Sequence, residues 1–594
     1  MKNKILWLLV SALMAISLVL ASCAGEEEEE EEVTVPTEEE EVVIPTEEEE
    51  VVIPPEGNWW DRWGKPEYGG TFTSRLVSDP TYWDPYYGTV GGMYLEHVAA
   101  LGWMVVPPET WEFRTRYNPI EYLTNVLAES WEIAPDWQSI TFHIRKGVHW
   151  QDLPPLNGRE LTAYDVEYSW HRVFGLGSGF TGPSPFANVR LYGPPESVIA
   201  TDKYTVTVRL PNPSVANIRM ILDDTPYAYT VPREVIEQYG DMNDWENVVG
   251  SGPFIIEDYV AGTAVTYVKN PDYWGYDEQY PENRLPYVDK VKQLIIPDSS
   301  TAIAALRTGK IDNLGGLSWE LAESIYKTNP ELVQDYYASG TMTVVMPVDR
   351  EPYSDIRVRK ALQMSIDLKT IAETYYGGYV DGTPVGQTMY DGYRAEYGDW
   401  PQEVKDGYAY NPEGAKQLLA EAGYPNGFKC TVTMSSSQDV DLMQILKAYF
   451  SDIGVDMTIE TFEGPTWYAY VYAGKAEMCT TLWSAWSFIS PVDRFVQLTS
   501  THRDANAHHL NDATFDEMVS KIKATLAEEE VKRLCREADL YAISKNWMIT
   551  VQPVPSFSFT QPWVKRHLPT ADVLLGYKMA RIWIDHDIKK AMGR

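Results

Sequence analysis

The stretch "FKCTVTMSSSQDVDLMQILKAYFSDIGVDMTIETF", residues 428–462, decides the fold class of this chain. Residues 428–434 are strand-like in composition, and residues 455–462 alternate apolar and polar side chains as a β-strand does. Between them, residues 440–454 repeat apolar side chains at the spacing of a helix. A strand, a helix and a second strand in this order predict parallel strands joined by a right-handed crossover.

The alternation continues on both sides of this stretch. Residues 411–427 predict a helix that Asn411 can cap and Gly423 can terminate. Residues 465–474 predict a short helix, and residues 477–483 a further strand. The second half of the chain is therefore expected to be α/β with a parallel sheet, whereas the first half has more strands with Gly and Pro turns and resembles a mixed α+β arrangement.

The start of the chain has the pattern of an export signal. Residues 5–22 carry no charge and follow Lys2 and Lys4, which is a positive region before an apolar one. Leu20-Ala21-Ser22-Cys23 resembles the bacterial lipobox, whose Cys is lipidated and becomes the first mature residue. The alternative interpretation is an uncleaved membrane anchor, because the apolar run is just long enough to cross a bilayer.

An acidic segment follows Cys23. Residues 26–32 are seven glutamates, and residues 33–53 repeat a nine-residue unit that contains Pro36 and Pro45. Such a segment cannot bury enough apolar surface to fold, and like charges with proline keep it extended. We expect residues 1–22 to be a signal peptide and residues 23–58 to be a lipidated Cys with a disordered tether of roughly 120 Å reach.

Length and charge limit the class of protein. About 535 residues remain after the tether, more than one hydrophobic core accommodates, so two or three domains are expected. The net charge is −37, and without Lys2, Lys4 and the 15 glutamates of residues 26–50 the rest still carries −24. This charge argues against binding to nucleic acid, which needs a basic surface, and against adhesion to anionic lipid.

Three cysteines follow Cys23, namely Cys430, Cys479 and Cys535. Cys430 and Cys479 stand in apolar, strand-like runs, which favours small buried thiols. A disulfide between two of the three is the alternative.

Several segments resemble the dipeptide- and oligopeptide-binding proteins of ABC importers, solute-binding family 5. They include "YGGTFTSRLVSDPTYWDP" (68–85), "LTAYDVEYSWHRV" (161–173) and a strand with an Asn-Pro-x-Tyr-Trp turn within 250–275. Further matching segments occur in the family's order, so that the resemblance spans roughly residues 66–565; they are residues 127–152, 300–312, 352–378 and 411–428.

The resemblance implies a periplasmic-binding-protein type II fold of two lobes, with an extra domain and a ligand cleft between the lobes. Lobe one would combine residues 60–104, 246–340 and 551–594, with the extra domain at residues 105–245. Lobe two would be residues 341–550. Ligand would bind between the lobes and favour a hinge closure.

The resemblance also suggests cleft residues. Within "TTLWSAWSFISP" (480–491), Trp483 falls where the family usually has a ligand-stacking Trp. Peptide binders of the family have an Asp three residues later, which holds the peptide ammonium, but this chain has Trp486. Asp493 could replace that charge.

The first cleft loop offers Tyr82, Trp83 and Tyr86 as further candidates. The alternative for each of these aromatic residues, as for Trp483, is ordinary packing, because the chain holds 21 Trp and 39 Tyr.

The hypothesis that the protein is an enzyme has little support in the sequence. A surface-anchored glycan hydrolase needs two carboxylates, but 86 acidic residues make carboxylate pairs uninformative. Motifs for a serine hydrolase, a zinc protease, a redox dithiol or a P-loop are missing from the sequence. His508-His509 is a poor metal site since adjacent residues rarely face one ion, and His502 has little more support; we expect neither metal nor cofactor.

The sequence therefore predicts a non-enzymatic, lipid-anchored solute receptor outside the cytoplasmic membrane. It would capture a peptide or an oligosaccharide-like solute as a monomer and deliver it to ABC permease subunits. A surface protein that binds nothing small is the remaining alternative.

Overall fold

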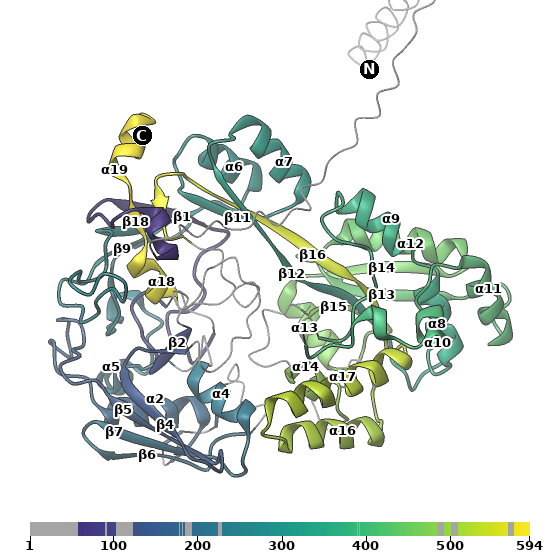
Figure 1. Cartoon of the computed structure of the whole chain (residues 1–594), viewed down its shortest axis with the longest axis horizontal. Helices are drawn as coiled ribbons and strands as arrows, with labels where there is room; N and C mark the ends of the chain where they lie inside the picture. Colours follow the sequence, from purple (N-terminus) through teal and green to yellow (C-terminus); the bar gives the residue numbers. More distant parts are fainter. Residues whose placement is uncertain are drawn as a thin grey trace, which may run out of the picture. The chain divides into compact units, whose positions relative to one another are not determined.

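The structure is a computed structural model (Figure 1). It describes residues 58–88, 92–101, 123–177, 179–180, 182–184, 193–223, 229–388, 390, 392–483, 492–500, 509–567 and 575–594. Trp60–Arg594 forms one compact unit. The signal segment, Cys23, the acidic tether, Trp486, His502 and His508 lie outside the described residues.

The predicted strand–helix alternation in the second half is confirmed. In chain order the elements are β13 (Lys429–Ser435), α12 (Val440–Asp452), β14 (Asp456–Phe462), α13 (Gly464–Tyr472) and β15 (Met478–Trp483). Strand β13 pairs in parallel with β14 on one side and with β15 on the other. The parallel α/β prediction is therefore correct.

Capping residues determine where the nearby helices begin. The side chain of Asn411 accepts a hydrogen bond from the backbone N–H of Gly414 at 2.9 Å and starts α11 (Pro412–Glu421). Asp355 caps α8 (Ile356–Met364) in the same way. Gly423 follows α11 with a φ of +95°, which a residue without Cβ adopts at little cost.

Six strands form the largest sheet, in the order β11-β16-β12-β15-β13-β14. Strand β11 covers Asn313–Leu317, while β12 (Val333–Val345) and β16 (Met548–Thr560) are each 13 residues long. These two long strands run antiparallel side by side (Figure 1), and their register shifts between Ala338 and Thr343. Such shifts mark β-bulges, which bend a strand locally.

Two four-stranded sheets occupy the first half of the chain. One has the order β1-β10-β9-β8, and the other is the fully antiparallel β4-β5-β7-β6. Two short two-stranded pairs complete the sheets. The strands are β1 (Thr71–Leu76), β8 (Phe254–Val260), β9 (Ala264–Lys269), β10 (Lys290–Ile295), β4 (Ala128–Ile133), β5 (Ser139–Ile144), β6 (Ser197–Asp202), β7 (Thr205–Arg209), β2 (Ala99–Leu101), β3 (Leu123–Asn125), β17 (Val564–Lys565) and β18 (Trp583–Ile584).

Helices surround these sheets. The remaining α-helices are α2 (Ala163–Phe174), α4 (Val215–Asp223), α5 (Arg233–Tyr239), α6 (Ser299–Arg307), α7 (Trp319–Thr328), α9 (Leu368–Thr370), α10 (Gln402–Asp406), α14 (Asp493–Gln497), α16 (Ala513–Ala524), α17 (Glu528–Ser544), α18 (Leu575–Arg581) and α19 (His586–Ala591). The lobe and domain boundaries given above stay predictions.

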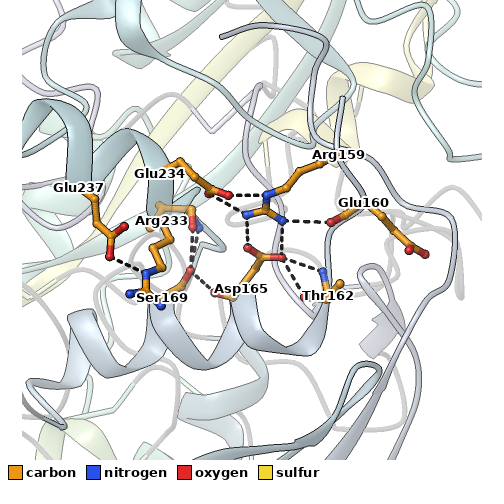
Figure 2. Close-up of polar contacts among 9 residues, drawn as sticks. Arg159, Glu160, Thr162, Asp165, Ser169, Arg233, Glu234 and Glu237 are labelled. Carbon is orange, nitrogen blue, oxygen red and sulfur yellow. Dashed lines mark hydrogen bonds and ion pairs between the residues drawn. The ribbon is translucent and has the colours of Figure 1, made fainter. Parts of the chain in front are cut away.

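An ion-pair network holds the start of α2, inside the segment 161–173 (Figure 2). Thr162 and Asp165 form a capping box, in which the backbone N–H of Thr162 donates to Asp165 at 2.8 Å. Arg159 lies between Asp165 and Glu234 and donates two hydrogen bonds to each carboxylate. Since Glu234 belongs to α5, the network joins the two helices, and this motif has a structural role.

The Asn-Pro-x-Tyr-Trp turn is held by a buried carboxylate that the sequence did not suggest. Glu96 is 3% exposed and accepts hydrogen bonds from the hydroxyl of Tyr273 at 2.8 Å and the indole N–H of Trp274 at 3.0 Å. In this turn Trp274 is half-buried, whereas Tyr273 is 3% exposed. Burial raises the pKa of Glu96 to about 7, against the lowering effect of these hydrogen bonds.

All three cysteines of the folded part are free and buried. The prediction of buried thiols is therefore confirmed. Burial raises the pKa of Cys430 and of Cys479 to about 12, so both are protonated and unreactive at neutral pH.

Glu96 makes the stability of this region depend on pH. The pKa of Glu96 is raised to about 7 in the folded state, so the folded chain keeps this proton at pH values where the unfolded chain, with an ordinary pKa of 4.5, has lost it. Stability therefore falls as the pH rises from about 4.5 to about 7. Glu96→Gln should become more stable relative to wild type as the pH rises from 5 to 8, by roughly 1–3 kcal/mol. Thermal unfolding at several pH values measures this difference. A Glu129→Gln control, at an exposed position of β4, should show no such trend, and a constant difference for Glu96→Gln would contradict the prediction.

Candidate functional site

A cavity of about 460 Å³ lies where β16 passes the carboxyl end of β13. Four segments line it, residues 316–320, 375–376, 437–439 and 554–556. The volume is within the range of roughly 300–1,000 Å³ that is typical of small-ligand sites. Residues 316–320 and 554–556 belong to predicted lobe one, and the other two segments to predicted lobe two.

The position of the cavity follows from the order of the parallel strands. The connection from β13 leads to its neighbour β14, whereas the connection from β14 passes β13 to reach β15 on the other side. Where successive connections leave in opposite directions, the carboxyl ends of the strands bound a crevice in which α/β proteins bind ligands. Residues 437–439 follow the carboxyl end of β13 and line the cavity there.

The side chain of Gln438 connects the ends of β13 and β15 at this point. The backbone pairing of the two strands ends at Thr433 and Cys479. Beyond it, the side-chain oxygen of Gln438 accepts hydrogen bonds from the backbone N–H of Ser435 at 2.9 Å and from the hydroxyl of Thr480. Gln438 is 9% exposed, so this crosslink fixes the loop after β13 as part of the cavity wall.

A chain of hydrogen bonds forms the aromatic side of the cavity. The indole N–H of Trp319, the first residue of α7, donates to the backbone carbonyl of Tyr375 at 2.7 Å. The hydroxyl of Tyr375 donates to Asp439 at 2.8 Å, and Asp439 caps α12 by accepting from the N–H of Leu442 at 2.9 Å. Since α7, the segment around Tyr375 and α12 are tied together, the wall is preorganised for a ligand.

The neighbouring tyrosines are protonated at any physiological pH. Burial raises the pKa of Tyr375 well above its ordinary value, and the hydrogen bond to the Asp439 carboxylate raises it further. Burial likewise raises the pKa of Tyr376, which is 3% exposed. Both side chains are therefore neutral phenols; the Tyr375 hydroxyl is bonded to Asp439, and the Tyr376 hydroxyl is buried.

Comparison with known proteins shows which family the chain belongs to. Residues 123–506 match the model of bacterial extracellular solute-binding proteins, family 5 middle, which is more than half of the chain. The chain belongs to this family.

Two relatives illustrate what this family 5 protein is similar to. It is 27% identical over 485 residues to heme-binding protein A of Haemophilus influenzae, which covers 77% of this chain and 83% of the relative. It is 24% identical over 472 residues to the periplasmic oligopeptide-binding protein OppA of Salmonella typhimurium, over 74% of this chain and 80% of the relative. Both relatives are binding proteins, which fits the expectation that this chain is not an enzyme.

A solved structure supports the fold. The ABC transporter-associated periplasmic binding protein DppA from Helicobacter pylori, in complex with the peptide STSA, superposes with a TM-score of 0.70 at 23% identity. The match covers 87% of this chain and 99% of that chain. The predicted two-lobed, type II binding-protein fold is therefore confirmed. Within the described residues, no helix combines the length and the apolar character needed to cross a membrane.

The three aromatic candidates of the first loop lie outside the residues that line the cavity. Trp83 is 5% exposed and packs edge-on against Tyr259, with 5.4 Å between the ring centroids. Tyr86 is half-buried, and the guanidinium of Arg172 lies 4.7 Å from its ring centroid. Tyr82 is half-buried and stacks on Tyr87. As ligand contacts, all three stay predictions.

A buried ion pair explains why this loop is ordered. Asp84 is completely buried and accepts two hydrogen bonds from Arg172, each of 2.8 Å. It also accepts the backbone N–H groups of Tyr86 and Met242. A bidentate pair that is further hydrogen-bonded satisfies a buried charge, so Asp84 fixes the loop together with the packing of Trp83.

The β15 candidates are placed only in part. Trp483 is the last residue of β15, where its backbone pairs with Thr341 of β12. Trp486 falls outside the described residues. Asp493, the suggested substitute for the missing acid, is completely buried in α14. As ligand contacts, both tryptophans remain predictions.

A second cavity, of about 360 Å³, contains His509 beside Asp349 at 3.1 Å. The described part of the chain contains no cluster of three or more side chains suited to a metal ion. The expectation of no metal stays a prediction, because His502 and His508 are outside the described residues.

Sequence reasoning missed the residues that line the main cavity. The polar run Ser435-Ser436-Ser437-Gln438-Asp439 directly after a parallel strand is a signal that could have found one wall, because ligands bind at carboxyl ends of such strands. Trp319 and Tyr375 carry no comparable signal, since they meet only through the tertiary fold.

Gly377 is required by the aromatic wall. Its φ is +63°, and a Cβ there would lie 2.6 Å from the ring of Trp319. Gly377→Ala should lower the free energy of unfolding by about 2–4 kcal/mol, of which about 1–2 kcal/mol is left-handed strain and the rest displacement of the indole. The matched control is Gly423→Ala, which has a φ of +95° with no atom within 4 Å of the added Cβ. Chemical denaturation of both variants compares them, and equal losses would show that Trp319 is not held against Gly377.

Proposed function

We propose that this family 5 protein captures a small solute in the cavity beside β13 and β16 and delivers it to the permease of an ABC importer. The observation that carries the proposal is a ligand-sized cavity at the carboxyl end of a parallel strand, lined from both predicted lobes. The relatives support it, because their names describe haem and oligopeptide binding and an ABC-transporter association.

Closure around the solute would occur at the two long strands. We place the hinge at the register shifts of β12 and β16 between Ala338 and Thr343, because bulges interrupt the ladder there. The two lobes and the extra domain would have the boundaries predicted from the sequence. A ligand that touches both lobes favours the closed state by the free energy of its additional contacts.

The solute would be a peptide or an oligosaccharide-like compound, with non-peptide solutes preferred. A buried peptide ammonium needs a carboxylate partner, and leaving it unpaired costs several kcal/mol. Trp486 stands where the peptide binders of the family have that acid. Asp493 is 0% exposed, so it does not replace that acid in this conformation. Among the described lining residues, only Glu320 and Asp439 could pair with an ammonium.

Filling the cavity tests the binding site. Ser437→Trp should abolish solute binding, because an indole would occupy the space beside Asp439. Native mass spectrometry should detect a co-purified solute on wild type, chemically unchanged after release, and none on the variant. Ser436→Trp is the matched control, as Ser436 is also exposed but does not line the cavity. If the Ser437→Trp protein retains the solute, the site lies elsewhere.

The receptor would be held at the outer face of the cytoplasmic membrane as a monomer. Acyl chains on Cys23 would anchor it, and the acidic tether would keep the folded part clear of the bilayer, since each buried CH₂ adds about 0.8 kcal/mol.

Removal of the lipidation site tests the anchor. Cys23→Ala should release the protein from membranes or leave it unprocessed, as shown by fractionation and by gel mobility. Cys535→Ala is the control, because that thiol is buried in the folded part. A Cys23→Ala protein that fractionates and migrates like wild type would exclude lipidation.

A further inference from the structure

The described part of the cavity lining contains carboxylates and no cationic side chain. Among the described residues that line it, Glu320 and Asp439 are acidic, and no Lys, Arg or His is present. The other polar side chains are neutral hydrogen-bonding groups, Ser318, Ser437, Ser556, Gln438 and the two tyrosines, with the Trp319 indole beside them. The lining therefore carries a formal charge of −2 from these two carboxylates.

Two helix N-termini reach this cavity, and each already has a carboxylate of its own. The N-terminus of a helix carries about half a positive charge and attracts anions. At α12 that position is occupied by Asp439, which accepts the N–H of Leu442 at 2.9 Å. At α7 the carboxylate in the first turn is Glu320. A carboxylate therefore stands at each helix end, where it offsets part of the positive potential that would attract a ligand anion.

The hydrogen-bonding groups of the site also disfavour a negatively charged ligand. A carboxylate accepts hydrogen bonds and cannot donate them. Asp439 has one oxygen engaged by Tyr375 and Leu442, and Glu320 is exposed at the cavity edge. Hydroxyl or amine hydrogens on a ligand satisfy such acceptors, whereas a ligand carboxylate placed beside them is repelled in an environment of lower dielectric than water.

We infer that the part of the solute that enters this cavity is a head group without negative charge and rich in hydrogen-bond donors, such as a sugar ring or an amine. The inference rests on the proposed function and specifies its ligand class. A peptide that presents its terminal carboxylate to the cavity is disfavoured, and the same peptide with a terminal amide is accepted more readily.

Matched ligands test this preference directly. Calorimetry and thermal shift with the full chain compare tetra-alanine, tetra-alanine amide, a neutral tetrasaccharide and a linear polyamine. The amide should bind at least about tenfold tighter than the free acid, and the tetrasaccharide or the polyamine should raise the Tm. Equal or tighter binding of the free acid overturns the inference, and so does a failure of every uncharged and cationic probe to bind.

Charge variants on α7 test whether the preference for uncharged or cationic ligands arises from the cavity lining. Glu320→Gln should weaken polyamine binding by about threefold to tenfold, leave the tetrasaccharide unaffected and improve binding of the free acid. Glu323→Gln is the matched control, because it removes the same charge from the same helix but lies outside the cavity lining, paired with Lys327. If both variants change affinity equally, the effect comes from overall charge and the inference fails.

The outcome is separable from that of the proposed function. Solute binding that persists in Ser437→Trp removes the cavity as the site. Binding that is lost in Ser437→Trp while carboxylate ligands bind best leaves the site in place and overturns only the assigned ligand class.

Discussion

The antiparallel pairing of β12 and β16 is the constraint on which the rest of the structure depends. One end of β16 supplies Phe557 and Phe559 to the core that contains α6 and α7, and its other end supplies Ile549 and Val551 to the core around β13 and α12. Strand β16 therefore belongs to two hydrophobic cores, whereas β12 contributes Met342 and Val344 to the second of them. Strand β12 also pairs with β15 and so connects the parallel unit. The backbone pairing of both strands continues on either side of the bulges, so the hinge proposed above would bend the sheet at that point.

Buried carboxylates fix the loops around these cores. Asp84 accepts the Arg172 guanidinium and two backbone N–H groups, and Asp539 is completely buried and accepts the N–H groups of Gln387 and Ala395. Glu96 performs the same task for a tyrosine and a tryptophan of one turn. Such carboxylates accept hydrogen bonds from polar groups of irregular segments, which have no partner in a helix or a sheet. Because these buried carboxylates have structural roles, burial of a carboxylate does not indicate a catalytic residue in this chain. Pairs of acidic residues in the sequence were uninformative for the same purpose, since the chain contains 86 of them.

Local features of the fold were predictable from the sequence, and the site was not. The helix cap Asn411 and the alternation over residues 428–483 act within a few residues, so periodicity and capping rules predicted them correctly. The cavity depends on β16, which approaches β13 from more than a hundred residues later in the chain. Resemblance to the family suggested Trp83, but burial of that ring against Tyr259 is a tertiary outcome that spacing alone does not encode.

The location of the cavity explains how binding and closure can be coupled without a separate device. Trp319 belongs to the α7 core, whereas Asp439 begins α12 of the other core, and Tyr375 bonds to both. A solute held between residues 318–320 and 437–439 adds contacts that depend on the distance between the two cores, while a solute touching one side alone leaves that distance unbiased. Because the aromatic wall already links the cores through two hydrogen bonds, ligand contacts reinforce an arrangement that the ligand-free chain can form, which lowers the ordering cost of binding.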